Sequence, residues 1–267
     1  NEFVIRDDQF YATGDQFLAW NLSQFDTSHR TIKALKLYQD LERFHLKSNS
    51  KFALYYNTID RLVFVYNKDV RTSDRDDLFL SSLKSYYSAN QSNDESIAIL
   101  KQYIESLMNV ANGYVAGSND PARWLYRDVL ALCNPAIERW GSNKHPLIVN
   151  DLNLIRNTKA SIETPFTNCV FEKQVYPQKP FLVNVEFKNL KSFTIEYRKL
   201  SESDFRDITI LRYENRDAVI ELVASRFPDS EQLVTVPDAG DYRKHTVLVS
   251  QEGLPVGNYL ITIAFDT

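Results

Sequence analysis

Apolar residues in the first half of the chain recur every three or four positions, the spacing of one face of an α-helix. In residues 31 to 46 this stripe comprises Ala34, Leu37, Leu41 and Phe44, widened by Leu35 and Tyr38. A second stripe runs through residues 52 to 66, after a short polar connector at residues 47 to 51. Together the two stripes predict a helical hairpin.

Two more hairpins are predicted downstream. Stripes in residues 78 to 87 and 97 to 111 flank a polar connector, and residues 125 to 140 and 147 to 155 form the third pair. Asp120-Pro121 is typical of a helix start, Pro135 is expected to kink the helix, and Gly141 to end it in a left-handed conformation. A repeat of roughly 40 to 45 residues is typical of solenoids built from helix pairs, here a TPR-like array.

After about Thr158 the apolar period changes from 3.6 to 2, which predicts a domain boundary. Alternation in residues 181 to 187 and 193 to 197, joined through Asn189-Leu190, predicts a β-hairpin. Further strands are expected at residues 162–171, 219–227, 232–236, 246–250 and 258–265, with turns at 237–240 and 254–257. We therefore predict an α+β chain, with an all-α domain at 1–158 and an antiparallel β-sandwich at 159–267.

Composition narrows the classes of partner. Lys and Arg number 31 against 35 Asp and Glu, so the net charge of −4 disfavours nucleic acid. No run approaches the roughly 18 apolar residues that would span a bilayer. The chain opens at Asn1 without an initiator methionine or signal-peptide pattern, and we expect that an upstream segment has been removed.

Residues that carry catalytic or metal chemistry are scattered. Cys133 and Cys169 fall in different predicted domains and are expected to be small buried side chains. No zinc spacing joins the four histidines, His29, His45, His145 and His245.

The spacing of three acidic residues, Asp74, Asp76 and Asp77, is compatible with the start of a calcium-binding loop. The apolar Leu78 and Phe79 that follow favour a helix start capped by Thr72 or Ser73. The loop that contains Gly113 and Gly117 lacks the lysine that a phosphate-binding glycine-rich loop requires. We expect no catalytic site, cofactor or metal, although spacing alone does not exclude an acid pair such as Glu202 and Asp204.

The tyrosines allow two interpretations. Six of them lie on the predicted helices: Tyr55, Tyr56, Tyr86, Tyr87, Tyr103 and Tyr126. They share stripes with leucine and isoleucine, which favours a place in the core. Alternatively, they line a groove that binds peptide or glycan.

Several stretches of the chain match one known family. In the predicted helices they are Leu35-Lys36-Leu37-Tyr38-Gln39-Asp40-Leu41, Leu62-Val63-Phe64-Val65-Tyr66-Asn67 and the helix from Trp124 to Trp140. In the predicted sandwich they are Tyr176-Pro177-Gln178-Lys179-Pro180, Lys188-Asn189-Leu190 and Leu254-Pro255-Val256-Gly257-Asn258-Tyr259. With these stretches the chain resembles, from about Arg30 onward, the N-terminal part of the large alpha-2-macroglobulin-like proteins of Bacteroidetes-type bacteria.

The resemblance implies a role in a longer protein. Residues 160 to 267 look like its first macroglobulin-type sandwich, preceded by a helical extension and followed by further macroglobulin-type domains. Such proteins are exported, periplasmic or bound to the cell envelope, and they inhibit endopeptidases by closing around a protease that cuts a bait segment. Neither Cys133-Asn134-Pro135-Ala136 nor Cys169-Val170-Phe171-Glu172 is their Cys-Gly-Glu-Gln thioester. The resemblance thus implies a non-catalytic scaffold and interaction fragment whose parent protein meets proteases.

Overall fold

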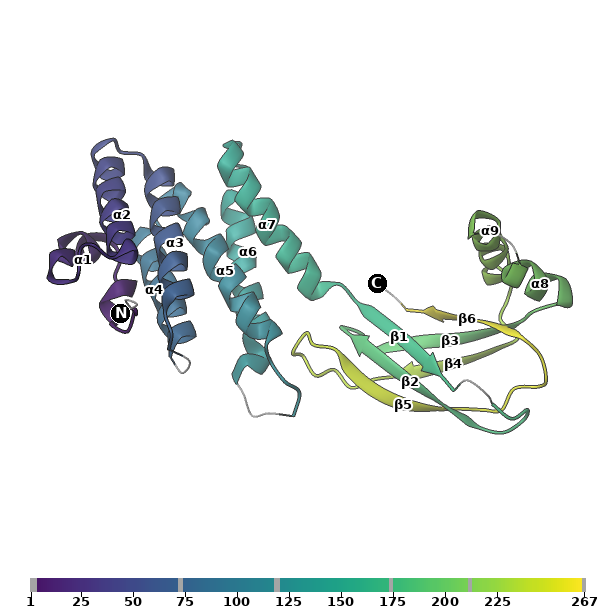
Figure 1. The fold of residues 1–267 in the computed structure, drawn as a ribbon. Coiled ribbons are helices and arrows are strands. Elements are labelled where there is room, and N and C mark those ends of the chain that lie inside the picture. Colours follow the sequence, from purple (N-terminus) through teal and green to yellow (C-terminus); the bar gives the residue numbers. More distant parts are fainter. Residues whose placement is uncertain (1–3, 72–73, 118–120, 173–174, 211–212, 266–267) are drawn as a thin grey trace. The chain divides into compact units, whose positions relative to one another are not determined.

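The computed structural model describes residues 4–71, 74–117, 121–172, 175–210 and 213–265. The chain divides into two compact units, which we call the helical unit (residues 1–162) and the sheet unit (residues 163–267). Figure 1 labels their elements.

The helical unit contains the three predicted helix pairs, which confirms the helical array. The pairs are α2 (Arg30–Lys47) with α3 (Lys51–Lys68), α4 (Arg75–Asn90) with α5 (Ile97–Asn112), and α6 (Leu125–Trp140) with α7 (Pro146–Glu163). Helix α5 also packs against α3 and α6, so the pairs form one continuous array. Short helices η1 (Asp8–Tyr11), α1 (Gly14–Ala19), η2 (Leu22–Gln24), η3 (Asp94–Ser96) and η4 (Pro121–Trp124) complete the unit.

Two details of the array differ from the expectations, at Gly141 and at the end of α7. Gly141 has φ −59° and ψ −28°, so it is right-handed and the predicted left-handed ending is wrong. Helix α6 includes Pro135 in one uninterrupted element, and Asp120 lies outside the described residues. Helix α7 extends to Glu163, five residues beyond the expected change at Thr158. Its last turn is held by Ile162, whose side chain is buried.

Helix α2 buries the face opposite to its leucine stripe. The buried positions are Thr31, Ile32, Leu35, Gln39 and Glu42, whereas Leu37, Leu41 and Phe44 are exposed. Gln39 is buried because its amide donates to the backbone oxygens of Phe17 and Trp20, at 2.7 and 2.9 Å. Polar side chains that form hydrogen bonds with buried groups therefore lie on the inner face of α2, and the apolar stripe lies on its exposed face.

The segment before α2 was not predicted to have structure, yet it supplies much of the core. Phe10, Tyr11, Phe17, Trp20 and Leu22 are buried in one cluster with residues of α2, α3 and α4. Arg61 of α3 anchors this segment, donating to the carbonyl oxygens of Phe10 at 3.0 Å and Ala12 at 2.7 Å. Its Nε donates to Glu42 at 3.2 Å, and its guanidinium lies 3.7 Å from the centroid of the Phe17 ring. We call these contacts the Arg61 network.

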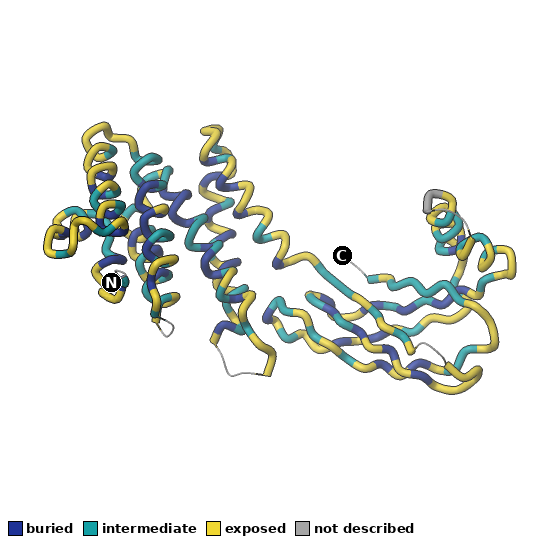
Figure 2. Tube along the Cα trace, viewed as in Figure 1, coloured by how far each residue is buried: buried dark blue, intermediate teal, exposed yellow. Residues whose placement is uncertain are grey.

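The sheet unit holds two antiparallel three-stranded sheets (Figure 1). One has the order β1 (Phe166–Phe171), β2 (Phe181–Lys188), β5 (His245–Gln251), and the other β4 (Ser230–Thr235), β3 (Ser192–Lys199), β6 (Tyr259–Ala264). Alternate side chains of both sheets fill one core: Phe181, Val183, Val185, Phe187, Leu190, Phe193, Ile195, Tyr197, Val234, Val236 and Val249. Figure 2 shows buried positions in dark blue along the strands of this unit.

The predicted β-hairpin between β2 and β3 is wrong, because the two strands belong to different sheets. Asn189 adopts a left-handed φ of 55° and Leu190 is buried, so the connection crosses from one sheet to the other. Alternation correctly identified the buried side chains of both strands. It carries no information on which strand becomes the hydrogen-bonded neighbour.

A predicted strand at residues 219–227 is also wrong. This stretch is mostly helix α9 (Tyr213–Ala224), which follows α8 (Glu202–Ile210) between β3 and β4. A short apolar run does not distinguish strand from buried helix, and here Val223 alone points fully inward. Strand β1 begins at Phe166 rather than at Ile162, which belongs to α7. Within the described residues of this unit, six strands form where about seven were expected.

Candidate functional site

The six tyrosines do not share one surface. Tyr55 and Tyr86 are buried and meet edge to face, with ring centroids 5.8 Å apart. The Tyr55 hydroxyl donates to Asn90 at 3.1 Å, and that of Tyr86 donates to Thr58 at 3.3 Å. Burial is the first cause of the raised pKa of both phenols. These two side chains occupy the core between α3 and α4.

The other four tyrosines are half-buried. Tyr56 and Tyr87 pack against the cluster around Tyr55 and Tyr86, whereas Tyr103 packs against the cluster that includes the N-terminal segment. Tyr126 donates to Asn112 at 2.7 Å. None of the six lines either of the two cavities described below. The tyrosine-lined groove therefore stays a prediction, with its members spread over several contacts.

Tyr56 makes the longest-range contact of this set. Its hydroxyl donates to the buried carboxylate of Asp151 on α7 at 2.8 Å, across 95 positions of sequence. Burial raises the pKa of Asp151, and the hydrogen bond from Tyr56 and the charge of Lys101 oppose that shift. Burial and then the Asp151 hydrogen bond raise the pKa of Tyr56. The pair ties the first helix pair to the third.

We expect the substitution Asp151→Asn to reduce the loss of stability that accompanies rising pH. The pKa of Asp151 is higher in the folded chain than its ordinary value of 3.8. Between the unfolded and the folded pKa of Asp151, the folded chain therefore binds more protons than the unfolded chain. As a result, the contribution of Asp151 to the free energy of unfolding falls as pH rises through the folded pKa. Urea unfolding from about pH 4 to 7, followed by tryptophan fluorescence, measures the difference.

The matched control for this experiment is Asp60→Asn, which removes an exposed carboxylate from α3. We expect the control to follow the pH dependence of the unsubstituted chain. If D151N and the unsubstituted chain keep the same slope of stability against pH, burial of Asp151 does not govern its ionisation.

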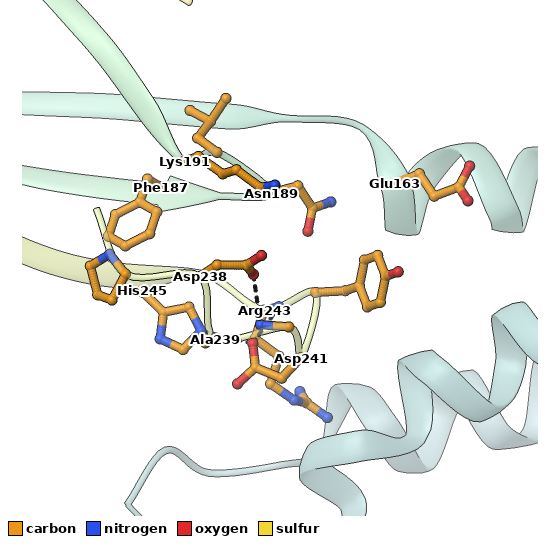
Figure 3. A pocket seen from close by; sticks show the side chains of 13 residues that line it. Glu163, Phe187, Asn189, Lys191, Asp238, Ala239, Asp241, Arg243 and His245 are labelled. Carbon is orange, nitrogen blue, oxygen red and sulfur yellow. Dashed lines mark hydrogen bonds and ion pairs between the residues drawn. The ribbon is translucent and has the colours of Figure 1, made fainter. Parts of the chain in front are cut away.

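A cavity of about 310 Å³ lies in the sheet unit, where the turn at residues 237–243 meets the crossing between β2 and β3 (Figure 3). The predicted turn is present, with Gly240 at φ 61° and its N–H donating to Asp238 at 2.9 Å. The imidazole Nε2 of His245 lies 2.8 Å from Oδ1 of the buried Asp241. Tyr242 between them takes a strained φ of 57°.

An Asp–His pair orients an imidazole for proton transfer, and in serine- or cysteine-type catalysis that imidazole activates a neighbouring hydroxyl or thiol. The described residues that line this cavity include no serine, threonine or cysteine. Asp241 also accepts from the backbone N–H of Arg243 at 3.1 Å, so its carboxylate already organises the turn. The contact between His245 and Asp241 is accounted for by this structural role.

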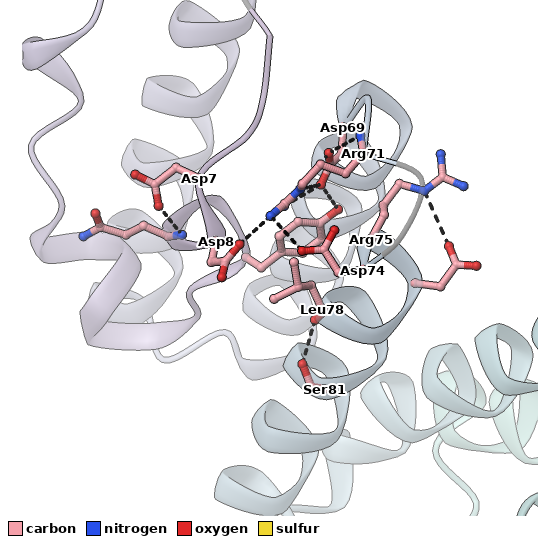
Figure 4. A network of polar contacts seen from close by, with 11 residues as sticks. Asp7, Asp8, Asp69, Arg71, Asp74, Arg75, Leu78 and Ser81 are labelled. Carbon is pink, nitrogen blue, oxygen red and sulfur yellow. Dashed lines mark hydrogen bonds and ion pairs between the residues drawn. The ribbon is translucent and has the colours of Figure 1, made fainter. Parts of the chain in front are cut away.

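A second feature, at Arg71, was not found by sequence reasoning (Figure 4). Arg71 donates to the buried carboxylate of Asp69 at 2.6 to 3.0 Å, pairs with Asp8, and lies 3.7 Å from Asp74. The hydroxyl of Tyr11 also donates to Asp69, at 3.0 Å. Burial favours a raised pKa for Asp69, but the hydrogen bonds from Arg71 and Tyr11 outweigh it and lower the pKa.

A groove of about 570 Å³ lies beside Arg71, lined by polar side chains of the N-terminal segment and of α4. Ser81, one of its hydroxyls, donates to the backbone oxygen of Leu78 at 3.0 Å. The Arg71 contacts join three chain segments, and no local sequence motif predicts them.

The acids near residue 74 start a helix, as predicted. Asp74 is the N-cap residue of α4, and Asp76 and Asp77 occupy its first turn. Tyr66 and Arg75 both bond to Asp76, so this carboxylate already has partners. The proposed caps Thr72 and Ser73 lie outside the described residues. In the described part of the chain, no group of three or more His, Cys, Asp or Glu side chains is placed to hold a metal ion.

The remaining candidate residues have different surroundings. Cys133 is buried in α6 of the helical unit, and Cys169 is half-buried in β1 of the sheet unit. Asp204 accepts hydrogen bonds from the Arg226 guanidinium through both carboxylate oxygens, at 2.8 and 3.0 Å. Its partner is therefore a cation, and it does not form an acid pair with Glu202. This ion pair lowers the pKa of Asp204.

Comparisons with known proteins add no relative. No family model matches the chain, and neither the curated proteins nor the solved structures contain a significant match. Among the described residues, no helix combines the length and the apolar character needed to cross a bilayer.

Proposed function

We propose that this chain is a non-catalytic scaffold and interaction fragment of an alpha-2-macroglobulin-like, protease-trapping protein. The observation that carries the proposal is the order of the two units, a helical array followed by two antiparallel sheets around one core. The proposal includes a TPR-like identity for the array and a macroglobulin-type sandwich for the sheets. It also includes an exported or envelope-bound parent with further macroglobulin-type domains.

The stretches that carry the resemblance occupy structural positions in the sheet unit. Lys188-Asn189-Leu190 makes the crossing between the two sheets. Gln178, in one matching stretch, donates its N–H to the carbonyl oxygen of Leu254, in another, at 2.9 Å. Tyr259 closes the latter stretch by donating to the backbone oxygen of Pro255 at 3.0 Å. Residues with these roles maintain a fold rather than perform chemistry, which supports a scaffold role.

The parent protein provides the test. We expect its reading frame to encode further β-sandwich domains after Thr267. The purified parent, mixed with an endopeptidase, should abolish cleavage of a large protein substrate and leave cleavage of a small chromogenic peptide largely intact, because the trapped protease keeps its active site. The 267-residue chain alone is the matched control, and we expect it to leave both activities unchanged.

Two results would contradict the proposal. One is a parent reading frame without further sandwich domains. The other is a parent that inhibits cleavage of both substrates equally, which indicates a blocked active site rather than a trap.

A further inference from the structure

Helix α2 presents an apolar seam to solvent. Leu37 is 60% exposed, Leu41 37% and Phe44 63%, and Ala34 beside them is half-buried. The opposite face of α2 is held against α3 and the N-terminal segment. The helix is therefore fixed in place while these side chains remain uncovered in the described structure. We call Ala34, Leu37, Leu41 and Phe44 the α2 seam.

The spacing of the α2 seam points to a helix as its partner. Its members are separated by three, four and three positions, the a and d pattern of a coiled coil over two heptads. Such a stripe is narrow and matches the width of one packed helix. An outer helix of a repeat array ordinarily shows a polar face to solvent. The α2 seam departs from that rule in the way a docking helix requires.

The charges beside the seam restrict that partner further. Lys33, Asp40 and Lys47 lie seven positions apart along one flank, and all three are exposed. In coiled coils, flanking charges select partner and orientation. Antiparallel pairing of two copies of α2 places Lys33 against Lys47 and Asp40 against Asp40, so like charges meet throughout. These like-charge contacts disfavour antiparallel pairing with a second copy of the chain.

Asp40 is the acidic member of this flank. Its side chain is 73% exposed, and it forms an ion pair with Arg43 at 3.1 Å. Facing a lysine or arginine of a partner helix, the same carboxylate forms an ion pair. The basic, acidic, basic order of the flank is complementary to an acidic, basic, acidic row.

We propose that the α2 seam docks an amphipathic helix of another protein. The partner helix presents apolar residues at three-four spacing and an acidic, basic, acidic row facing Lys33, Asp40 and Lys47. This proposal goes beyond the scaffold role and does not rest on it.

Two designed helical peptides of about three heptads test the proposal. Both carry leucine at the seam positions; the first has Glu, Lys, Glu along the flank and the second Lys, Glu, Lys. Fluorescence anisotropy with the full 267-residue chain measures their binding. We expect the first peptide to bind at least about tenfold more tightly than the second, because only its charges are complementary.

Variants of the chain locate the binding site. Leu37→Asn combined with Phe44→Asn is expected to weaken binding of the first peptide at least about tenfold without changing the circular dichroism spectrum, because both positions are exposed. Leu248→Asn, at a β5 position that is 66% exposed, is the matched control and should leave binding unchanged. The triple variant Lys33→Glu, Asp40→Lys, Lys47→Glu should prefer the second peptide.

Equal binding of the two peptides, or no binding of either, overturns the proposal. It is also overturned if vesicles containing anionic lipid bind the chain through the seam while the first peptide does not. A dimer in sedimentation equilibrium that the L37N/F44N variant dissociates would instead assign the seam to a second copy of the chain.

Discussion

Replacing Arg61 with methionine is expected to lower the free energy of unfolding of the helical unit by about 3–5 kcal/mol. Arg61 is fully buried, and Glu42 beside it is 1% exposed. The substitution leaves the Glu42 carboxylate buried without its counter-charge. It also leaves the carbonyl oxygens of Phe10 and Ala12 without their donor. An uncompensated buried charge and two unsatisfied acceptors cost more than the lost attraction alone.

Tryptophan fluorescence during urea unfolding measures this effect, because the three tryptophans, Trp20, Trp124 and Trp140, all lie in the helical unit. Lys84→Met, on the exposed surface of α4, is the matched control and should change stability by less than about 0.5 kcal/mol. Adding Glu42→Leu to Arg61→Met should recover part of the loss, since no buried charge then remains.

The pH dependence of stability also tests the role of the Arg61 network. Burial raises the pKa of Glu42 above its ordinary value, and Arg61 opposes that shift. Without Arg61 the pKa should rise further, so the R61M variant should lose stability more steeply than the unsubstituted chain as pH rises through it. Equal stability of R61M and the unsubstituted chain at neutral pH would contradict the anchoring role of Arg61.

The substitution Phe193→Ala is expected to destabilise the sheet unit by about 3–5 kcal/mol. Phe193 is 1% exposed in the core that both sheets share, and it pairs with Val234 across β3 and β4. Truncating the ring removes buried apolar surface and leaves a cavity that the surrounding strands fill only in part. Hydrogen exchange of the β3 and β4 amides measures the loss, since the tryptophans lie elsewhere.

The matched control is Leu233→Ala, one position along β4 from Val234 and 69% exposed. Because Leu233 lies on the outer face of the sheet, its truncation should cost less than about 0.5 kcal/mol. Comparable loss of amide protection in L233A and F193A would mean that the core does not lie between the two sheets.

Local periodicity was enough to identify the six long helices of the array and most of the strands. The buried residues of β2 and β3 were correctly predicted because alternation depends only on neighbours two positions apart. The acids at residues 74 to 77 were likewise correctly assigned to a helix start, since the preference of a first turn for negative charge is local. The amino-acid sequence by itself therefore determined the helical or extended state of the long segments from α2 to β3, whereas the short helices before α2 and the helices α8 and α9 did not follow from it.

Tertiary structure decided which faces and which partners these elements use. The inner face of α2 carries Gln39 and Glu42 because carbonyl oxygens of the N-terminal segment and Arg61, distant in sequence, supply their hydrogen bonds. The same holds for Tyr56 and Asp151, which meet across 95 positions. It also holds for β2 and β3, which pair in different sheets although three residues separate them. Such contacts depend on groups brought together only by the packed chain, and no local pattern encodes them.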